Sequence, residues 1–475
     1  MQNNNAKMKT VKLLFCLMCV TCIKSQTVQN KLDAEMKTFL KDAQMKHAII
    51  SLYVVNTKTN EVVYALNEET GLAPASCQKI FTSIAAFDLL GKDYRYKTEI
   101  GYNGNIVNGT LNGNIFISGY GDPTLASWRY TDTKDSVLLN RWMRAIKNNN
   151  IKKINGNCYL DNSKFIFNAT PGGWIWDDMG NYYGAGTWAL NWHENQFDLI
   201  MQPGKQEGDS VKIIKTEPSL INYKLKNFIT TGRAGSGDNS YIYSSPYATT
   251  AFAEGTIPAQ EKPFIISGSI PFPSVQIKAA FEKYFKLFNI SVHQIKLSEE
   301  VNNNKQLTAK PTEIIYTNYS PTLDSINYHF LKKSINFYGE TFVRTIALEK
   351  TGIGNFDSGI NIVRRYWKER GIEKAALHII DGSGLSPQNR VTTHALVTAL
   401  QYAQQQKWFN FFYNALPEYN GMKLKSGTIG GTKSFAGYHT AKNKTAYTVA
   451  VIVNNFDGSA NEIVKKIFKV LDELK

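Results

Sequence analysis

The stretch from Leu72 to Gly91 is the part of the sequence that most restricts what the chain can fold into. Small and polar residues give way at Ile80 to a run of apolar positions, and Gly91 marks its end, which predicts a buried amphipathic helix. Ser76 lies in the first turn of this predicted helix, and Lys79 follows three residues later. Because side chains three residues apart are neighbours on a helix, we expect the hydroxyl and the amine to lie within reach of each other.

A serine held beside a lysine is an arrangement for covalent catalysis. The hydroxyl becomes a nucleophile when a base removes its proton, and a lysine serves as that base when burial lowers the pKa of its amine. The helix N-terminus adds partial positive charge beside the hydroxyl. The alternative is that Ser76 is a helix cap and Lys79 a solvated surface charge. Against this, Ser-x-x-Lys occurs nowhere else in the chain, and partner motifs follow in the order that this chemistry uses.

The first 25 residues have the pattern of a secretory signal peptide. Lys7, Lys9 and Lys12 precede an apolar run from Leu13 to Ile23, which is too short to cross a membrane as a helix. An uncleaved anchor is the alternative. No second long apolar stretch follows, so we expect a secreted protein, periplasmic if the source is Gram-negative.

Charge and cysteine content narrow the partners of the mature chain. The sequence carries 54 basic and 39 acidic residues, a net charge of +15, and the leader holds four of the lysines, which leaves about +11. This surplus suits an anionic partner such as cell-wall polymer, but it is spread out and export argues against nucleic acid. Only Cys77 and Cys158 remain after the leader, so one disulfide is possible, although a small packed residue is the usual role of a cysteine in such a turn. We expect no metal and no cofactor, because neither cysteine has clustered partners.

The chain changes character twice, which predicts an α/β catalytic domain interrupted by a long insertion. About 450 mature residues exceed one ordinary core. The early residues mix helical and strand-like patterns, with a hairpin turn at 57–60. In the middle of the chain, short strand-like runs alternate with Gly, Asn and Asp turns. Helical periodicity returns in the last part. We expect a catalytic domain from residues 26–95 and 306–475, and a mostly β insertion of two subdomains at 96–305.

Serine enzymes built on Ser-x-x-Lys also need a Ser-x-Asn that moves protons and holds the substrate amide. Three copies are present, beginning at Ser325, Ser334 and Ser459. The last follows every candidate for the third motif and is out of order. Ser334 leads into a segment where a helix can present it, whereas Ser325 lies early in its own segment, so we favour Ser334 with Asn336.

The third motif of these enzymes is Lys-[Ser/Thr]-Gly on a strand that faces the serine. The literal spelling at 350–352 closes a predicted helix, where a glycine is the usual stop. The alternative at 425–428, Lys-Ser-Gly-Thr, leads into glycine turns and strand-like runs. We choose Lys425, because an edge strand can lie antiparallel along a peptide substrate.

With these motifs assigned, the chain resembles the D-Ala-D-Ala carboxypeptidase/endopeptidases of the penicillin-binding protein 4 type, also called class C low-molecular-mass penicillin-binding proteins. The resemblance covers nearly the whole mature chain and includes a large insertion between the first two motifs, whose serines here are 258 positions apart. The fold it implies is an α/β (α+β) serine transpeptidase/β-lactamase-like domain. The resemblance also rests on four further segments, Gly119-Tyr-Gly-Asp-Pro-Thr-Leu125, Pro171-Gly-Gly-Trp-Ile-Trp-Asp-Asp-Met179, Leu331-Lys-Lys-Ser-Ile-Asn336 and Asp381-Gly-Ser-Gly-Leu-Ser386.

The resemblance implies a role for each motif residue in a serine-type hydrolase of peptidoglycan. Ser76 would attack the carbonyl of the penultimate D-alanine, with Lys79 as base and Ser334 relaying the proton to the leaving amine. The backbone amides of Ser76 and Thr428 would form the oxyanion hole. The other implied contacts are Asn336 with the substrate amide, Lys425, Ser426 and Thr428 with the terminal carboxylate, and Trp176 and Asp178 with the charged end of the diamino-acid side chain.

The expected partners are stem peptides, ending in D-Ala-D-Ala or crosslinked, and β-lactams as covalent inhibitors. A serine β-lactamase shares the acylation chemistry, but no Glu-x-x-Leu-Asn occurs between Asn336 and Lys425. A catalytically inactive wall-binding relative is the second alternative, and the intact motif residues speak against it. A homo-oligomer is a possible assembly on which the sequence is silent.

Overall fold

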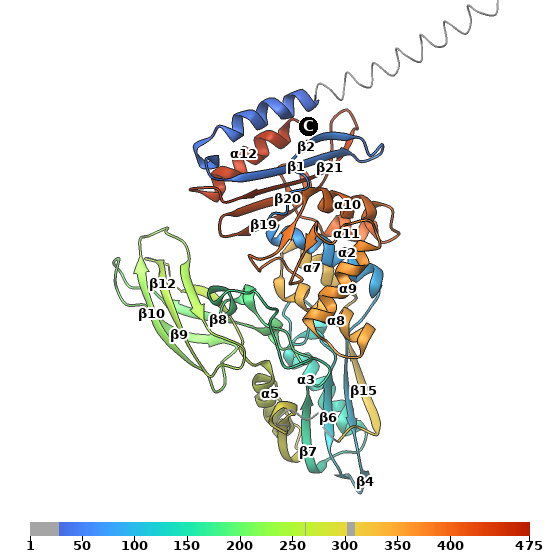
Figure 1. Cartoon of the computed structure of the whole chain (residues 1–475). Helices are drawn as coiled ribbons and strands as arrows, with labels where there is room; N and C mark the ends of the chain where they lie inside the picture. Colours follow the sequence, from blue (N-terminus) through green and yellow to red (C-terminus); the bar gives the residue numbers. More distant parts are fainter. Residues whose placement is uncertain (1–27, 262, 302–308) are drawn as a thin grey trace, which may run out of the picture. The chain divides into compact units, whose positions relative to one another are not determined.

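The computed structural model of the chain describes residues 28–261, 263–301 and 309–475. The predicted signal peptide lies outside the described residues. Within these ranges, no helix is both long and apolar enough to span a membrane. The chain divides into two compact units, each assembled from segments that are distant in sequence (Figure 1). Of the described residues, unit 1 contains those from 28 to 81, 367 to 379 and 388 to 475, and unit 2 contains those within 82–366 and 380–387.

Unit 1 is built on a six-stranded antiparallel sheet with the order β18-β19-β20-β21-β1-β2. Runs rich in β-branched and aromatic residues form its strands. The predicted hairpin is confirmed as β1 and β2, and β1 pairs along its whole length with β21. The strands are β1 (Ile49–Asn56), β2 (Val62–Leu66), β18 (Glu418–Tyr419), β19 (Met422–Ile429), β20 (Thr432–Thr440) and β21 (Ala446–Asn454).

The two faces of this sheet have different coverings. One face packs against a helix over residues 28–40 and against α12 (Ala460–Asp472), and this layer is the apolar core of the unit. The other face carries α10 (Thr393–Gln404) and the turn η2 (Ala75–Gln78). Because side chains alternate along a strand, each strand sends one set into the core and the other toward this turn. Further elements of the unit are η1 (Ala43–Met45), β16 (Leu377–His378), β17 (Arg390–Val391) and α11 (Phe409–Ala415).

Unit 2 contains one seven-stranded sheet and two three-stranded sheets. The large sheet has the order β15-β3-β6-β7-β5-β4, with β14 also paired to β7, and the small sheets are β13-β8-β9 and β10-β12-β11. The strands are β3 (Lys97–Tyr102), β4 (Asn105–Val107), β5 (Thr110–Asn112), β6 (Ile115–Gly119), β7 (Lys153–Asp161), β8 (Gln196–Gln202), β9 (Lys212–Glu217), β10 (Lys224–Gly232), β11 (Asn239–Tyr243), β12 (Thr250–Pro258), β13 (Phe264–Ser269), β14 (Ser291–Leu297) and β15 (Glu313–Tyr319).

Two long helices lie in the region that the sequence analysis describes as mostly β. α3 (Asp135–Asn148) and α5 (Pro273–Leu287) bury their apolar faces on the large sheet, and the rings of Trp142 and Phe281 meet with centroids 5.7 Å apart. The strand-and-turn signal of the surrounding residues obscured the helical spacing of the apolar positions. The boundaries of the insertion at 96–305 stay a prediction, because these units are defined by compactness alone.

The remaining helices of unit 2 follow the large sheet in sequence. α8 is buried along nearly all its length and ends with Gly352 in the left-handed region, at φ 82°. This confirms that the literal Lys-Thr-Gly at 350–352 is a helix end. The helical elements are α2 (Lys79–Leu89), which begins in unit 1, α4 (Trp176–Met179), α6 (Ser298–Val301), α7 (Leu323–Lys332), α8 (Asn336–Thr351), α9 (Phe356–Lys368), which ends in unit 1, and the short turns η3 (Thr131–Thr133), η4 (Tyr182–Gly184) and η5 (His193–Asn195).

Candidate active site

Ser76 and Lys79 are in direct contact. Lys79 Nζ donates a hydrogen bond to Ser76 Oγ over 2.9 Å, as the three-residue spacing predicts. The lysine side chain is fully buried, whereas the serine is half-buried. A buried amine therefore lies beside a hydroxyl that retains access to solvent.

The local backbone differs from the prediction of one continuous helix. Ser76 lies in the 3₁₀ turn η2, and the α-helix begins only at Lys79. Ala75, just before the serine, has φ 46°, in the left-handed region that residues with a Cβ rarely adopt. The left-handed residue and its preceding proline, Pro74, break the helical path. Since a 3₁₀ turn places residues i and i+3 directly above each other, the serine–lysine contact survives.

Three strands of unit 1 hold this turn in place. Ser434 Oγ on β20 donates to the Pro74 carbonyl over 2.6 Å, and Cys77 Sγ donates to the Lys425 carbonyl on β19 over 3.1 Å. Asn454 at the end of β21 also binds the backbone of Ala73, accepting from its N–H over 2.8 Å and donating to its carbonyl over 3.1 Å. The nucleophile turn is therefore fixed to the sheet.

Gly427 allows β19 to approach the serine. A Cβ at this position would lie 2.6 Å from the Pro74 carbonyl oxygen and 2.8 Å from the Ser76 nitrogen, closer than such atoms pack. The glycine of the Lys-Ser-Gly sequence is thus required by close approach of two backbones. Within unit 1, the first and third motifs are neighbours, as the choice of Lys425 requires.

The side chains of the third motif project to opposite sides of β19. Lys425 is only 1% exposed, its ammonium donates to the Ser426 carbonyl over 2.7 Å, and burial lowers the pKa of the amine to about 8. Ser426 and Thr428 share the other side. Ser426 Oγ donates to Tyr419 Oη over 3.1 Å, and the exposed Thr428 accepts at Oγ1 from Lys433 Nζ over 2.7 Å.

The outer edge of β19 is partly open. The edge strand β18 pairs only with Met422 and Lys423, and the next N–H, of Leu424, is bonded to the Pro417 carbonyl. Because the hydrogen-bonding direction alternates along an antiparallel strand, the backbone N–H of Thr428 points to this same edge. A peptide can add there as a further strand.

The second motif lies in unit 2. Ser334 is in the two-helix connection between α7 and α8, with φ 57°, and Asn336 is the first residue of α8. Asn336 Nδ2 donates to the Tyr183 carbonyl over 2.9 Å. The rejected copy at 325–327 lies inside α7, where Asn327 accepts from Ser83 over 2.7 Å.

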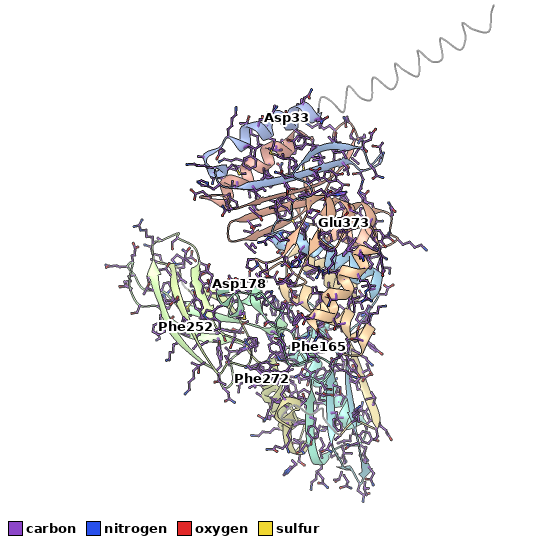
Figure 2. All side chains as sticks on the ribbon, in the orientation of Figure 1. Asp33, Phe165, Asp178, Phe252, Phe272 and Glu373 are labelled. Atoms are coloured by element: carbon purple, nitrogen blue, oxygen red, sulfur yellow. The ribbon has the colours of Figure 1, made fainter. Side chains whose placement is uncertain are left out.

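Trp176 and Asp178 lie close to Asn336 within unit 2. Both belong to α4, which packs against η4, the turn whose Tyr183 binds Asn336. Trp176 is 45% exposed, and Asp178, marked in Figure 2, is half-buried. Burial, followed by repulsion from Asp177, raises the pKa of Asp178 to about 6. An acidic group and an exposed indole therefore stand near the second motif.

Two of the other segments that carried the family resemblance also meet in unit 2. Trp174 Nε1 donates to Asp381 Oδ2 over 3.1 Å. The same carboxylate accepts from the backbone N–H groups of Gly384 and Ser386. Sequence reasoning recognised both segments and gave no hint that they touch.

Sequence reasoning also missed Lys433. Its position on β20, directly opposite Thr428, follows only from the strand register.

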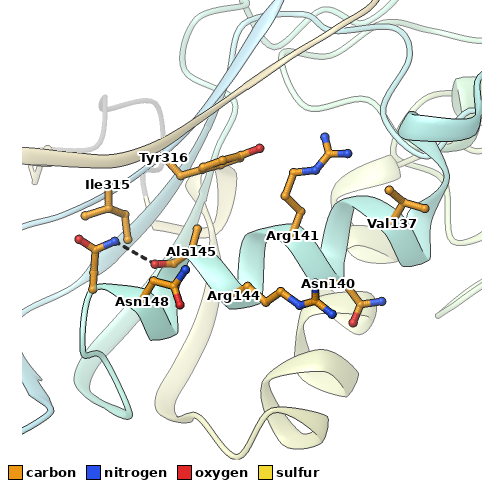
Figure 3. Close-up of a pocket in the computed structure, with 9 residues that line it drawn as sticks. Val137, Asn140, Arg141, Arg144, Ala145, Asn148, Ile315 and Tyr316 are labelled. Atoms are coloured by element: carbon orange, nitrogen blue, oxygen red, sulfur yellow. Dashed lines mark hydrogen bonds between the residues drawn. The ribbon is translucent and has the colours of Figure 1, made fainter.

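Cys77 and Cys158 are both free and buried. A cavity of about 570 Å³ between α3 and β15 is lined in part by Arg141, Arg144 and Tyr316 (Figure 3), and none of its lining residues belongs to a predicted motif.

Known proteins are similar to this chain over most of its length. The profile of the D-Ala-D-Ala carboxypeptidase 3 (S13) family matches residues 32–474. A D-alanyl-D-alanine carboxypeptidase of Actinomadura sp. is 25% identical over 444 residues, covering 86% of this chain and 78% of that protein. The D-alanyl-D-alanine carboxypeptidase DacB of Haemophilus influenzae is 26% identical over 395 residues, covering 83% of this chain and 78% of that protein.

Solved structures give the same fold. Penicillin-binding protein 4 (dacB) of Haemophilus influenzae matches with a TM-score of 0.75 and 22% identity, covering 90% of this chain and 95% of that one. A second structure of that protein, in complex with a β-lactam, matches with a TM-score of 0.70. The predicted fold class is confirmed.

Proposed function

Because the chain belongs to the D-Ala-D-Ala carboxypeptidase 3 (S13) family, we propose that it is a secreted serine-type D-Ala-D-Ala carboxypeptidase and endopeptidase of peptidoglycan stem peptides. The observation that carries the proposal is the 2.9 Å hydrogen bond between Lys79 and Ser76, in a turn against which β19 packs. β-Lactams acylate the same serine. The 96–305 segment is the insertion that carries part of the substrate site.

The reaction proceeds in two steps through an acyl-enzyme. Ser76 Oγ attacks the carbonyl carbon of the penultimate D-alanine while Lys79, buried and in contact with that hydroxyl, takes its proton. The carbon–nitrogen bond breaks, and the proton reaches the leaving amine through Ser334. Water then attacks the ester carbonyl, which releases the shortened peptide and restores the serine hydroxyl.

The oxyanion formed in each step is stabilised by two backbone amides, those of Ser76 and Thr428. The Thr428 N–H faces the open edge of β19, and this strand passes within van der Waals distance of the Ser76 backbone at Gly427. The substrate lies along this edge as an added strand. Preorganised donors of this kind need no rearrangement as charge develops.

Substrate recognition rests on the second and third motifs and on α4. Lys425, Ser426 and Thr428 bind the terminal carboxylate, and Asn336 binds the peptide amide. Asp178, beside the exposed ring of Trp176, binds the ammonium of the diamino-acid side chain.

Labelling with a fluorescent penicillin tests this proposal. We expect one adduct per chain, on the tryptic peptide that contains Ser76. In a parallel digestion, mass spectrometry should detect the release of D-alanine from monomeric muropeptides or the cleavage of crosslinked ones into monomers. Absence of labelling, or labelling at another residue, contradicts the proposal. An adduct that is released within seconds identifies a β-lactamase, and muropeptide cleavage by Ser76→Ala at the wild-type rate excludes the serine mechanism.

A further inference from the structure

We propose that Lys433 is a specificity-determining residue, which together with Thr428 binds the carboxylate at the C-terminus of the peptide substrate. This inference rests on the proposed function and adds a cation that lies outside the three motifs. The residue is on β20, while the motif lysine is on β19.

The position of Lys433 follows from the register of the two strands. Thr428 on β19 is directly opposite Lys433 on β20, and the ammonium donates to the threonine hydroxyl over 2.7 Å. Directly opposed residues place their side chains on the same face of the sheet. The pair therefore forms one polar group with an ammonium and a hydroxyl at the hairpin end of β19 and β20, on the face that carries Phe435. It reaches the substrate edge through Thr428, whose backbone N–H is the one proposed for the oxyanion hole.

The charge of Lys433 is not neutralised by the protein. Burial lowers the pKa of its amine, and the nearby Cys77 acts in the opposite direction. Among the described residues, no carboxylate forms an ion pair with Lys433. The side chain is half-buried and lies over the Phe435 ring, 5.2 Å from the centroid. A charge-assisted hydrogen bond to an incoming anion would offset the free-energy cost of removing water from the ammonium.

Lys425, the lysine already proposed to bind this carboxylate, is held differently from Lys433. It is fully buried and its ammonium is already bonded to the Ser426 carbonyl, whereas Lys433 reaches an exposed threonine. The two ammonium groups repel each other, and this repulsion contributes to the lowered pKa of Lys425. A carboxylate bound at Thr428 relieves this repulsion, so both lysines favour an anionic substrate end, and Lys433 adds a second cationic contact beside Thr428.

The test compares two substrates on one set of variants. A stem peptide ending in D-Ala-D-Ala and the same peptide with a C-terminal carboxamide differ only in the negative charge. For Lys433→Met, we expect kcat/KM on the free acid to fall about 10- to 100-fold, as expected when one partner of a partly buried charge pair is truncated. On the carboxamide, we expect little change. Lys433→Arg retains most of the preference.

Controls separate this inference from the function on which it rests. Lys442→Met removes an exposed lysine in the turn between β20 and β21, at the other end of β20 from Lys433, and leaves both rates unchanged. An equal loss on both substrates, or an unchanged acid-to-amide ratio in Lys433→Met and Lys433→Gln, overturns the role of Lys433 while the wild-type enzyme stays active. Failure of the wild type to be labelled at Ser76 overturns the proposed function itself. Circular dichroism and the unfolding midpoint establish that each variant is folded.

Discussion

The serine turn of unit 1 and the α4–η4 region of unit 2 are built in opposite ways. Around Ser76, the two lysines of the motifs are buried, and three strands fix the turn through hydrogen bonds. Around Asp178, the predicted recognition residues lie on a four-residue helix, where Trp176 is 45% exposed and Asp178 is half-buried. The proposed nucleophile is therefore held by a network of hydrogen bonds to the sheet, whereas the proposed recognition residues of α4 are held by one short helix.

The sharpest test of the rigid region is the nucleophile itself. Ser76→Ala should lower peptide hydrolysis by about 10³-fold or more and abolish penicillin labelling, because the group that forms the covalent bond is gone. Rates measured by D-alanine release give the first effect, and gel fluorescence gives the second. Ser325→Ala, in the rejected Ser-x-Asn copy, is the matched control and should keep wild-type rates. If the control loses activity instead, the assignment of motifs is wrong.

Lys425→Met separates function from stability in the same region. We expect the acylation rate to fall about 100-fold, as for a lost charged contact, while the unfolding midpoint at pH 7 stays equal or rises. The reason is that burial lowers the pKa of this amine to about 8, so the charged form costs free energy in the folded state. Stopped-flow labelling and thermal unfolding provide the two measurements.

The lowered pKa of Lys425 also predicts in which direction the stability of the protein changes with pH. Between pH 8 and 10.5 the unfolded chain holds a proton on Lys425 that the folded chain has released, so wild-type stability gains a contribution as the pH rises through this window. Urea unfolding at several pH values should show this contribution in the wild type and in Lys423→Met, and not in Lys425→Met. A large loss of stability in Lys425→Met at pH 7 would contradict it.

Gly427→Ala tests whether the close packing of β19 on the turn matters. The new Cβ would meet the backbone at Pro74 and Ser76, so we expect a loss of about 1–3 kcal/mol in stability and acylation about tenfold slower. Gly430→Ala is the control, since a Cβ there meets nothing within 4 Å. Equal behaviour of the two variants in urea unfolding and penicillin labelling would mean that the turn is not rigid.

The smallest effect is expected in the exposed region. Asp178→Asn should raise KM about three- to tenfold for stem peptides with a free diamino-acid ammonium, as for one charge contact near the surface. For peptides acetylated at that amine, KM should stay unchanged. Since burial and Asp177 raise the pKa of Asp178 to about 6, wild-type KM should rise as the pH falls through 6. The Asn variant should lack this step, and Asp177→Asn should keep it. A large loss of kcat in Asp178→Asn would erase the contrast between the two regions.

The sequence is most informative where chemistry depends on local spacing. Ser76 and Lys79 are three residues apart, and residues at this spacing are neighbours in a 3₁₀ turn as well as in an α-helix. Here the two side chains meet over 2.9 Å. The helix end at Gly352 and the hairpin of β1 and β2 are likewise local patterns. Such features follow from rules that act within one or two turns of chain.

The features that sequence reasoning missed depend on contacts between distant segments. The left-handed Ala75 is held by hydrogen bonds from strands more than 300 positions away, and nothing in its neighbours announces it. Lys433 gains its partner from the register of two strands, and a shift of one residue would turn its side chain to the other face. The helices α3 and α5 were hidden by the strand-rich sequence around them.

The pairing of β1 with β21 has a consequence for when activity begins. The serine is synthesised early, but β19, the strand proposed to receive the substrate, and β21, which pairs with β1, come from the final 54 residues of the sequence. Joining the two ends of a long polypeptide is a slow, late event in folding. A nascent chain, or one that lacks the C-terminal strands, would therefore carry Ser76 without β19 beside it, and by the proposed mechanism it would be inactive.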